Sequence, residues 1–313
     1  MKDLISCANP STGSMLQSFA EFLSIDVANG DAREDTLRSY QSNIKHWVDW
    51  CGMIGIYPAQ ATQETVKAYR KHLIERGYKT GTICLKLTVL RRFYQAAVER
   101  ALIQANPAQN VKAPRDRSAK EASTKYLTAG QLEMLIRSIP GNGGLKSVRD
   151  RAIIMLMALE GLRDVEIMRA NVGDIEDERI LIHGKGKDAF IYPRRDTLAA
   201  IREYAEARGP AVADTLGEPL FTAVGNRAGG RRISRDGIRT VIDGYLSELG
   251  LKRPGLSCHA LRHTCGTLLY QETKDLALVQ ETLRHSNPAT TSRYVHIVNR
   301  AQTRATEAIQ ISL

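Results

Sequence analysis

The chain has 313 residues, of which 43% are hydrophobic and 25% are charged. These values are typical of a folded protein with room for two domains, and they exclude a disulfide-stapled miniprotein or a disordered chain. Lys and Arg (44) outnumber Asp and Glu (34), which gives a net charge of +10 and favours a polyanionic partner such as nucleic acid or an anionic membrane surface.

The chain contains no run of about 18 uninterrupted apolar residues, so a membrane-spanning helix is not expected. Its first residues, MKDLISCANP, lack the apolar core of a signal peptide, and its five cysteines include no C-x-x-C pair. We therefore expect a cytoplasmic protein, associated with the nucleoid if its partner is DNA. Divided at Ser118, the two halves each carry a net charge of +5, so if DNA is the partner we expect both halves to contact it.

The first third of the chain carries amphipathic helical patterns. Apolar residues recur at helical spacing over residues 36–50, which predicts a helix there. Thr62 is a suitable N-cap for a second helix that ends near Gly77, and a third helix is expected to begin at Thr80. These patterns predict a small all-helical domain over residues 14–109.

Residues 110–124, NVKAPRDRSAKEAST, are rich in charged and small residues and have no sustained apolar period. This composition predicts an interdomain linker. Residues 125–313 then form a second domain with a C-terminal tail.

The second domain is expected to combine helices with a small sheet. The β-prone runs RILIH and AFIYP flank GKGKD, whose glycines suit a turn, so a hairpin is predicted over residues 179–193. The expected fold class is mainly α with a small β-sheet, in which an all-helical N-terminal domain precedes an α+β domain. Helices are predicted over residues 128–139, 148–159 (ending at Gly161), 196–208, 234–249 and 259–270.

Four short motifs in the second domain carry more functional information than the composition does. They are GLRDVEI (161–167), HGKGKDAFIYP (183–193), HALRHT (259–264) and LRHSNPATTSRY (283–294). With these motifs the chain resembles the tyrosine recombinase (phage integrase) family, in particular its Xer-type and integrase members. The resemblance implies that the first domain is a core-binding (SAM-like) DNA-binding domain and that the second is the catalytic domain.

The resemblance implies six catalytic residues, in the family's order. It gives Tyr294 the role of nucleophile, which forms a 3′-phosphotyrosyl intermediate, and Lys185 the role of proton donor to the leaving 5′-oxygen. Cleavage of a phosphodiester without metal needs a nucleophile, a proton donor and cations beside the nonbridging oxygens, a task for which the planar fork of arginine is suited. The matching positions are Arg163, Lys185, His259, Arg262, His285 and Tyr294.

Each of these residues also has a simpler interpretation when taken alone. A helical arginine is usually solvated, Lys185 could be a turn lysine that is hard to distinguish from Lys187, and Tyr294 could be a packing residue. Their occurrence together and in order favours the functional interpretation.

A metal site is the alternative for His259 and His263, because zinc ligands are often four residues apart on a helix. The zinc-protease motif would need glutamate at position 260, where the chain has Ala260, and no cysteine cluster offers further ligands. No metal or other cofactor is therefore expected. His259 and Arg262, three residues apart, can instead face one phosphate.

The chain departs from the family pattern near three of the motif residues. Arg284 stands where the family usually has glycine, Ala260 replaces a commoner aspartate, and Cys265 and Gly266 replace a commoner aromatic and small pair. Arg284 puts the local loop conformation in question and adds a candidate contact to the DNA phosphate.

The third N-terminal helix is expected to present a polar face that fits the major groove of DNA. A solvated helix face would explain the same pattern. The candidate DNA contacts on this helix are Lys79, Thr82, Lys86, Arg91 and Arg92.

The sequence thus predicts a site-specific recombinase of double-stranded DNA, which acts as a homotetramer on two DNA sites and as a monomer without DNA. A non-catalytic DNA-binding regulator and a type IB topoisomerase are the alternatives. Residues 298–313 have a loosely helical apolar pattern that could dock on the same subunit or on a neighbour. The target site, and the choice among integration, excision and resolution, are left open.

Overall fold

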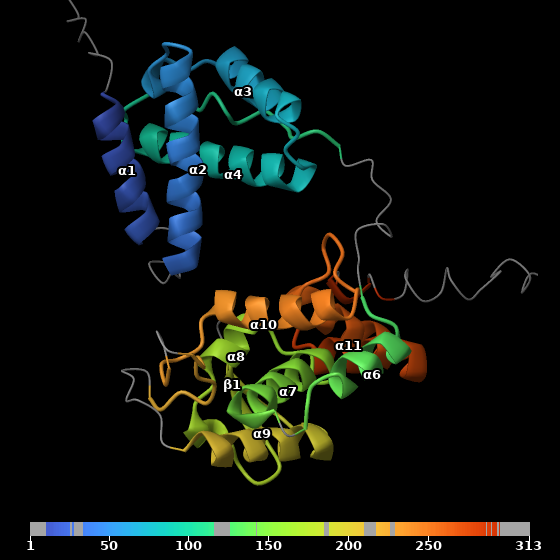
Figure 1. The fold of residues 1–313 in the computed structure, drawn as a ribbon. Helices are drawn as coiled ribbons and strands as arrows, with labels where there is room; N and C mark the ends of the chain where they lie inside the picture. The colour runs from blue at the N-terminus through green and yellow to red at the C-terminus, as the bar shows by residue number, and fades with distance from the viewer. Residues whose placement is uncertain are drawn as a thin grey trace, which may run out of the picture. The chain divides into compact units, whose positions relative to one another are not determined.

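The structure is a computed structural model in which the chain divides between Arg117 and Ser118 into two compact units. Figure 1 shows both units as ribbons. The structure describes residues 11–25, 27, 34–115, 126–141, 143–184, 188–209, 217–225, 229–285, 287–288, 290–292 and 294.

The described part of the first unit is helical, as predicted. Thr62 caps α3 and forms a capping box with Thr65, while Gly77 takes a φ of +73° just after the helix. Helix α4 packs against α1, α2 and α3 (Figure 1). The elements are α1 (Thr12–Ile25), α2 (Glu34–Met53), the 3-10 helix η2 (Pro58–Gln60), α3 (Gln63–Glu75) and α4 (Thr80–Glu99).

Aromatic side chains fill the core of the first unit. The ring of Trp47 from α2 packs against Tyr69 from α3, with ring centroids 4.9 Å apart, and against Tyr94 from α4. The core also includes Val111, which lies in the segment predicted to be a linker, and Arg70 Nη1 donates a hydrogen bond to the Lys112 carbonyl at 2.9 Å. The start of the predicted linker therefore packs on the first unit, whereas residues 116–124 lie outside the described residues.

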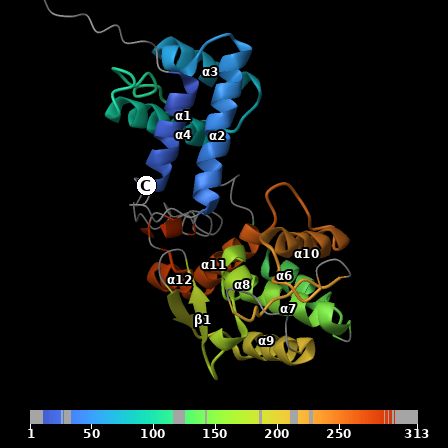
Figure 2. The same ribbon diagram turned by 90° about the vertical axis from the view of Figure 1, so that its left-hand side faces the viewer.

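The second unit is organised around α7, which packs against α6, α8, α9, α10 and α11. Figure 2 shows α9 on one side of α7 and α10 on the other. The elements are α6 (Ala129–Arg137), α7 (Gly144–Ala158), α8 (Asp164–Arg169), the 3-10 helix η3 (Val172–Asp174), β1 (Ile180–His183), β2 (Asp188–Ile191), α9 (Arg195–Arg208), α10 (Arg235–Glu248), α11 (Cys258–Thr273) and α12 (Leu276–Thr282).

The predicted hairpin is present as an antiparallel pair in which Ile180 lies opposite Ile191 and His183 opposite Asp188. The mainly helical fold with a small sheet is confirmed over the described residues. Helix α7, however, begins at Gly144 and not at the expected residue 148. Its N-cap is Gly143, which has no side chain to form a cap hydrogen bond, so the sequence carries no start signal there.

None of the helices described is both long enough and apolar enough to cross a membrane.

Gly161 makes the turn between α7 and α8 possible. Its φ is +67°, and a Cβ at this position would overlap Leu283 and lie 3.3 Å from Cys265 Sγ. The residues just after it begin α8, so this turn determines where α8 starts relative to α11.

We expect Gly161→Ala to lower the free energy of unfolding by about 2 kcal/mol or more, because the left-handed conformation alone costs a residue with Cβ about 1–2 kcal/mol. Gly244 on α10 is the matched control, since a Cβ there would meet nothing within 4 Å. Gly244→Ala should raise stability by up to about 1 kcal/mol through helix propensity. Thermal denaturation followed by circular dichroism measures the stability of both variants. Equal unfolding midpoints for the two would contradict the requirement for glycine at position 161.

Candidate active site

The motif residues come together around a small polar pocket in the second unit. The pocket has a volume of about 160 Å³. Its lining comes from the start of α8, the first turns of α11 and the segment after α12, which are far apart in the sequence. The lining residues are Arg163, His259, Arg262, His263, His285, Asn287 and Thr290.

Arg163 is held at the N-terminus of α8 by a buried carboxylate. The backbone N–H of Arg163 donates to Glu166 Oε2 at 2.9 Å, and its Nη1 donates to Glu166 Oε1 at 2.6 Å. Glu166 is only 1% exposed. The sequence did not single out Glu166, although a glutamate at the third position of a helix is the signal of a capping box.

Arg262 is the more buried of the two pocket arginines, at 2% exposed. Its Nη1 donates to the carbonyl of Gly161 and its Nη2 to the carbonyl of Leu283. Burial, and then the charge of Arg163, lower the pKa of Arg262 to about 10, so the guanidinium remains protonated at neutral pH. The two arginines therefore present fixed positive charge to one pocket.

The histidines of the pocket make contacts of different kinds. The rings of His259 and His263 meet edge to face with centroids 5.4 Å apart, and His285 Nδ1 lies 2.9 Å from Thr291 Oγ1. Among the residues that the structure describes, no group of His, Cys, Asp and Glu side chains is arranged to hold a metal ion.

Tyr294, the predicted nucleophile, lies beside the pocket and does not line it. Its side chain is 0% exposed, and its hydroxyl oxygen is 3.2 Å from His263 Nδ1. The ring fits against Gly266, where a Cβ would stand 2.6 Å from Tyr294 Cζ and 2.7 Å from Leu283 Cδ1. Because Gly266 has no side chain, the Tyr294 phenol ring fits against its backbone.

Arg284, the departure from the family pattern, has a φ of +52°, a conformation that favours glycine. Its Nη2 donates to Glu166 Oε2 at 3.0 Å and its Nη1 to the Thr282 carbonyl at 3.0 Å. The guanidinium therefore points to Glu166 and is not part of the pocket wall. Arginine in place of the family's glycine therefore does not change the loop to another conformation, because residue 284 still adopts a backbone conformation that suits glycine.

Lys185 and Lys187, between β1 and β2, lie outside the described residues, as does Ser286. A charged cluster lies at the end of β1, two residues before Lys185 in the sequence. His183 Nε2 lies 3.0 Å from both oxygens of Asp174, and its Nδ1 lies 3.0 Å from Asp188 Oδ2. Burial lowers the pKa of His183, but the hydrogen bonds and charges of both aspartates outweigh it and raise the pKa above its ordinary value.

The candidate DNA contacts on the third helix differ in exposure. Lys79, Thr82 and Arg92 are exposed and Arg91 is half-buried, whereas Lys86 is only 8% exposed. The Lys86 ammonium lies 5.5 Å from the centroid of the Tyr78 ring, and burial lowers its pKa. The expectation that Lys86 lies on an exposed polar face is therefore wrong, because packing against Tyr78 covers it.

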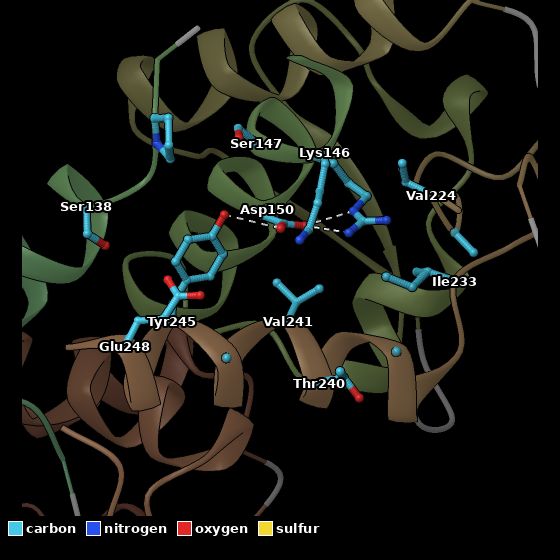
Figure 3. A pocket seen from close by; sticks show the side chains of 15 residues that line it. Ser138, Lys146, Ser147, Asp150, Val224, Ile233, Thr240, Val241, Tyr245 and Glu248 are labelled. Atoms are coloured by element: carbon cyan, nitrogen blue, oxygen red, sulfur yellow. Dashed lines mark hydrogen bonds and ion pairs between the residues drawn. The ribbon is translucent and has the colours of Figure 1, made fainter. Parts of the chain in front are cut away.

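A larger cavity of about 550 Å³ lies between α7 and α10 (Figure 3). Its buried charges are already paired: Arg149 Nη2 donates to Asp150 Oδ1 at 2.7 Å, and the Tyr245 hydroxyl donates to Asp150 Oδ2 at 3.3 Å. Arg149 Nη1 also donates to the Thr222 carbonyl at 3.0 Å. These contacts join α7 to α10 and to the loop before it, which is a structural role.

Comparison with known proteins adds independent information. A model of the phage integrase family matches residues 125–300, and a model of the phage integrase N-terminal SAM-like domain matches residues 16–101. The tyrosine recombinase XerC of Lactobacillus delbrueckii subsp. bulgaricus is 30% identical over 271 residues, which cover 84% of this chain and 88% of that protein. The tyrosine recombinase XerC of Herpetosiphon aurantiacus is 26% identical over 305 residues, which cover 95% of each chain.

Among solved structures, a lambda integrase tetramer bound to a Holliday junction is similar to this chain with a TM-score of 0.71 and 17% sequence identity. The match covers 97% of this chain and 81% of that chain. At this level of identity the likeness is one of fold.

We expect the Tyr294 ring to be shielded from reagents in the protein without DNA, because it is fully buried. Tetranitromethane, followed by peptide mass spectrometry, should modify the exposed Tyr192 at least tenfold faster than Tyr294. Gly266→Ala should expel the ring and raise modification of Tyr294, while the fully buried Tyr204 stays protected and reports that the domain is folded. Equal rates of modification of Tyr192 and Tyr294 in the native protein would contradict the burial of the Tyr294 ring.

Proposed function

Because the chain belongs to the phage integrase family, and is a tyrosine recombinase, we propose that it cuts and rejoins duplex DNA at specific sites through a 3′-phosphotyrosyl intermediate. The observation that carries the proposal is the pocket into which separate segments bring Arg163, Arg262, His259 and His285. A pocket of this size accommodates a phosphoryl group. Its two guanidiniums match the charge that gathers on the nonbridging oxygens during cleavage.

In the proposed cleavage step, the Tyr294 oxygen attacks phosphorus, a bond forms between them, and the bond from phosphorus to the 5′-oxygen breaks. The phenol proton passes to a pocket histidine, and the leaving 5′-oxygen receives a proton from Lys185. Nearby cations reduce the cost of ionising a phenol whose ordinary pKa is near 10. Tyr294 must first leave its stored position beside His263 and Gly266.

Rejoining is the reverse of cleavage. A 5′-hydroxyl attacks the phosphotyrosyl phosphorus, the bond to the Tyr294 oxygen breaks, and the tyrosine regains its proton. One phosphodiester is exchanged for another, so the reaction needs no external energy source and no metal or other cofactor.

The proposed working assembly on DNA is a homotetramer that holds two sites. Exchange between two duplexes requires four strand cuts, and one tyrosine per subunit makes one cut. The similar lambda integrase structure holds a tetramer on a Holliday junction, which supports this stoichiometry. The place of action follows that of the DNA substrate, in the cytoplasm at the nucleoid, and residues 298–313 are candidates for contacts between subunits.

Both units are proposed to contact the duplex. On the first unit, Lys79, Thr82, Arg91 and Arg92 remain the candidate contacts. Three of them are exposed on or beside α4 and Arg91 is half-buried, so their cationic and polar groups can reach phosphate and base edges.

Tyr294→Phe should abolish the covalent protein–DNA adduct and leave DNA affinity unchanged, because only the nucleophilic oxygen is lost. The measurement is denaturing gel electrophoresis after incubation with nicked DNA that traps the adduct, paired with a gel shift for affinity. Tyr192→Phe is the control, since Tyr192 is an exposed tyrosine of the same unit. An adduct formed by Tyr294→Phe would overturn the proposal. A separate assay for strand exchange between two marked DNA sites distinguishes a recombinase from a topoisomerase.

Lys185→Ala should slow cleavage of ordinary DNA by about a hundredfold, the usual contribution of a general acid. The defect should be far smaller on DNA in which sulfur replaces the leaving 5′-oxygen, because thiolate leaves without a proton. Lys187→Ala is the matched control on the same turn. Equal slowing of Lys185→Ala on both substrates would move the proton-donor role to another residue.

A further inference from the structure

Arg284 is placed at a position where its backbone is strained and its side chain has a specific partner. The φ of +52° disfavours any residue with a Cβ. Its side chain nevertheless reaches back from the end of α12 to Glu166 on α8, and is largely buried, with 17% of it exposed. A strained arginine that spans two elements needs a compensating interaction, and the contact with Glu166 supplies it.

The two oxygens of the Glu166 carboxylate are divided between Arg163 and Arg284. Oε1 accepts from Arg163 Nη1 at 2.6 Å, while Oε2 accepts from the Arg163 amide at 2.9 Å and from Arg284 Nη2 at 3.0 Å. Arg163 is one of the residues that line the pocket, and Arg284 is not. Glu166 thus bridges the guanidiniums of Arg284 and Arg163 directly.

We propose that Arg284 is a positioning residue for strand cleavage: it fixes the Glu166 carboxylate, which in turn holds the Arg163 guanidinium at the pocket. This inference rests on the proposed function and deepens it. It also replaces the interpretation of Arg284 as a direct DNA contact. Its Nη1 and Nη2 already have protein acceptors, and its buried Nε has none.

The charge of Arg284 also affects the ionisation of Glu166. Burial raises the pKa of Glu166, but the charge of Arg284, followed by the amide hydrogen bond and charge of Arg163, outweighs burial and leaves the pKa below its ordinary value. The charged groups around this carboxylate come from three elements: Arg163 at α8, Arg262 on α11 and Arg284 after α12. Asp164, the next acidic group on α8, is paired with Arg235 of α10 at 3.0 Å.

The sign of the pH effect follows from this lowered pKa. Above its pKa in the folded protein, Glu166 is ionised and pairs with Arg163. This ion pair is lost as the pH falls through that pKa. Removing Arg284 raises the folded pKa. The Glu166 carboxyl should therefore titrate at a higher pH in a variant without the guanidinium.

Arg284→Gly tests the proposal in the full chain, because glycine removes the guanidinium and also relieves the strained φ. We expect single-turnover cleavage at saturating protein to fall on the order of tenfold, as for a misplaced catalytic group, with DNA affinity unchanged. Arg284→Lys should restore part of the rate by returning a positive charge. Ala101→Gly, at another φ of +55° in the first unit, is the matched control and should leave cleavage unchanged.

Other outcomes overturn the proposal. A native rate of single-turnover cleavage for Arg284→Gly would show that the guanidinium has no positioning role. Weaker DNA binding with an unchanged rate at saturation would make Arg284 a phosphate contact instead.

Carbon-13 titration of the Glu166 carboxyl, without DNA, gives a readout that is independent of activity, with Glu166→Gln identifying the signal. A higher pKa in Arg284→Gly supports the proposal and an unchanged pKa refutes it. If the native protein forms no adduct with DNA, the proposed function fails, and this titration still tests the link between Arg284 and Glu166.

Discussion

The buried guanidinium of Arg262 is the interaction on which the site depends. It donates to the Gly161 carbonyl before α8 and to the Leu283 carbonyl at the end of α12, so one side chain of α11 joins the three segments that form the pocket. A buried charge that lost these acceptors would be very costly, so the segments are held together strongly. The left-handed Gly161 is what brings its carbonyl within reach.

The electrostatics of the site follow from a shortage of acidic groups. Arg163, Arg262 and Arg284 lie close together, and Glu166 is the carboxylate that they share. Among the residues that the structure describes, one carboxylate faces three guanidiniums and cannot neutralise them, so their net charge at the pocket is positive. That charge is stored in the folded protein before any substrate arrives, which is the arrangement by which enzymes avoid reorganisation cost during reaction.

The position of Tyr294 adds a conformational step to this arrangement. The ring lies in a space left by Gly266, with its hydroxyl beside His263, while the arginines already line the pocket. The Tyr294 hydroxyl thus contacts a histidine of the pocket, but its fully buried side chain is covered from outside the protein. On the proposed function, a tyrosine stored in this way would not react until substrate binding made its displacement favourable, which limits unwanted attack.

The sequence by itself predicted most of the longer helices, the hairpin and the motif residues, but it did not predict α8 and it placed the start of α7 four residues late. Helical periodicity, the N-cap at Thr62 and the glycine-containing turn are local signals, which can be read without knowledge of the fold. Only the tertiary structure decided the rest. The partners of Glu166, the covering of Lys86 by Tyr78 and the storage of Tyr294 against Gly266 depend on contacts between residues that belong to separate segments or face each other only after packing. Such contacts leave no periodic trace in the sequence, because burial and pairing are set by which helix faces meet and not by the spacing of residues within one helix.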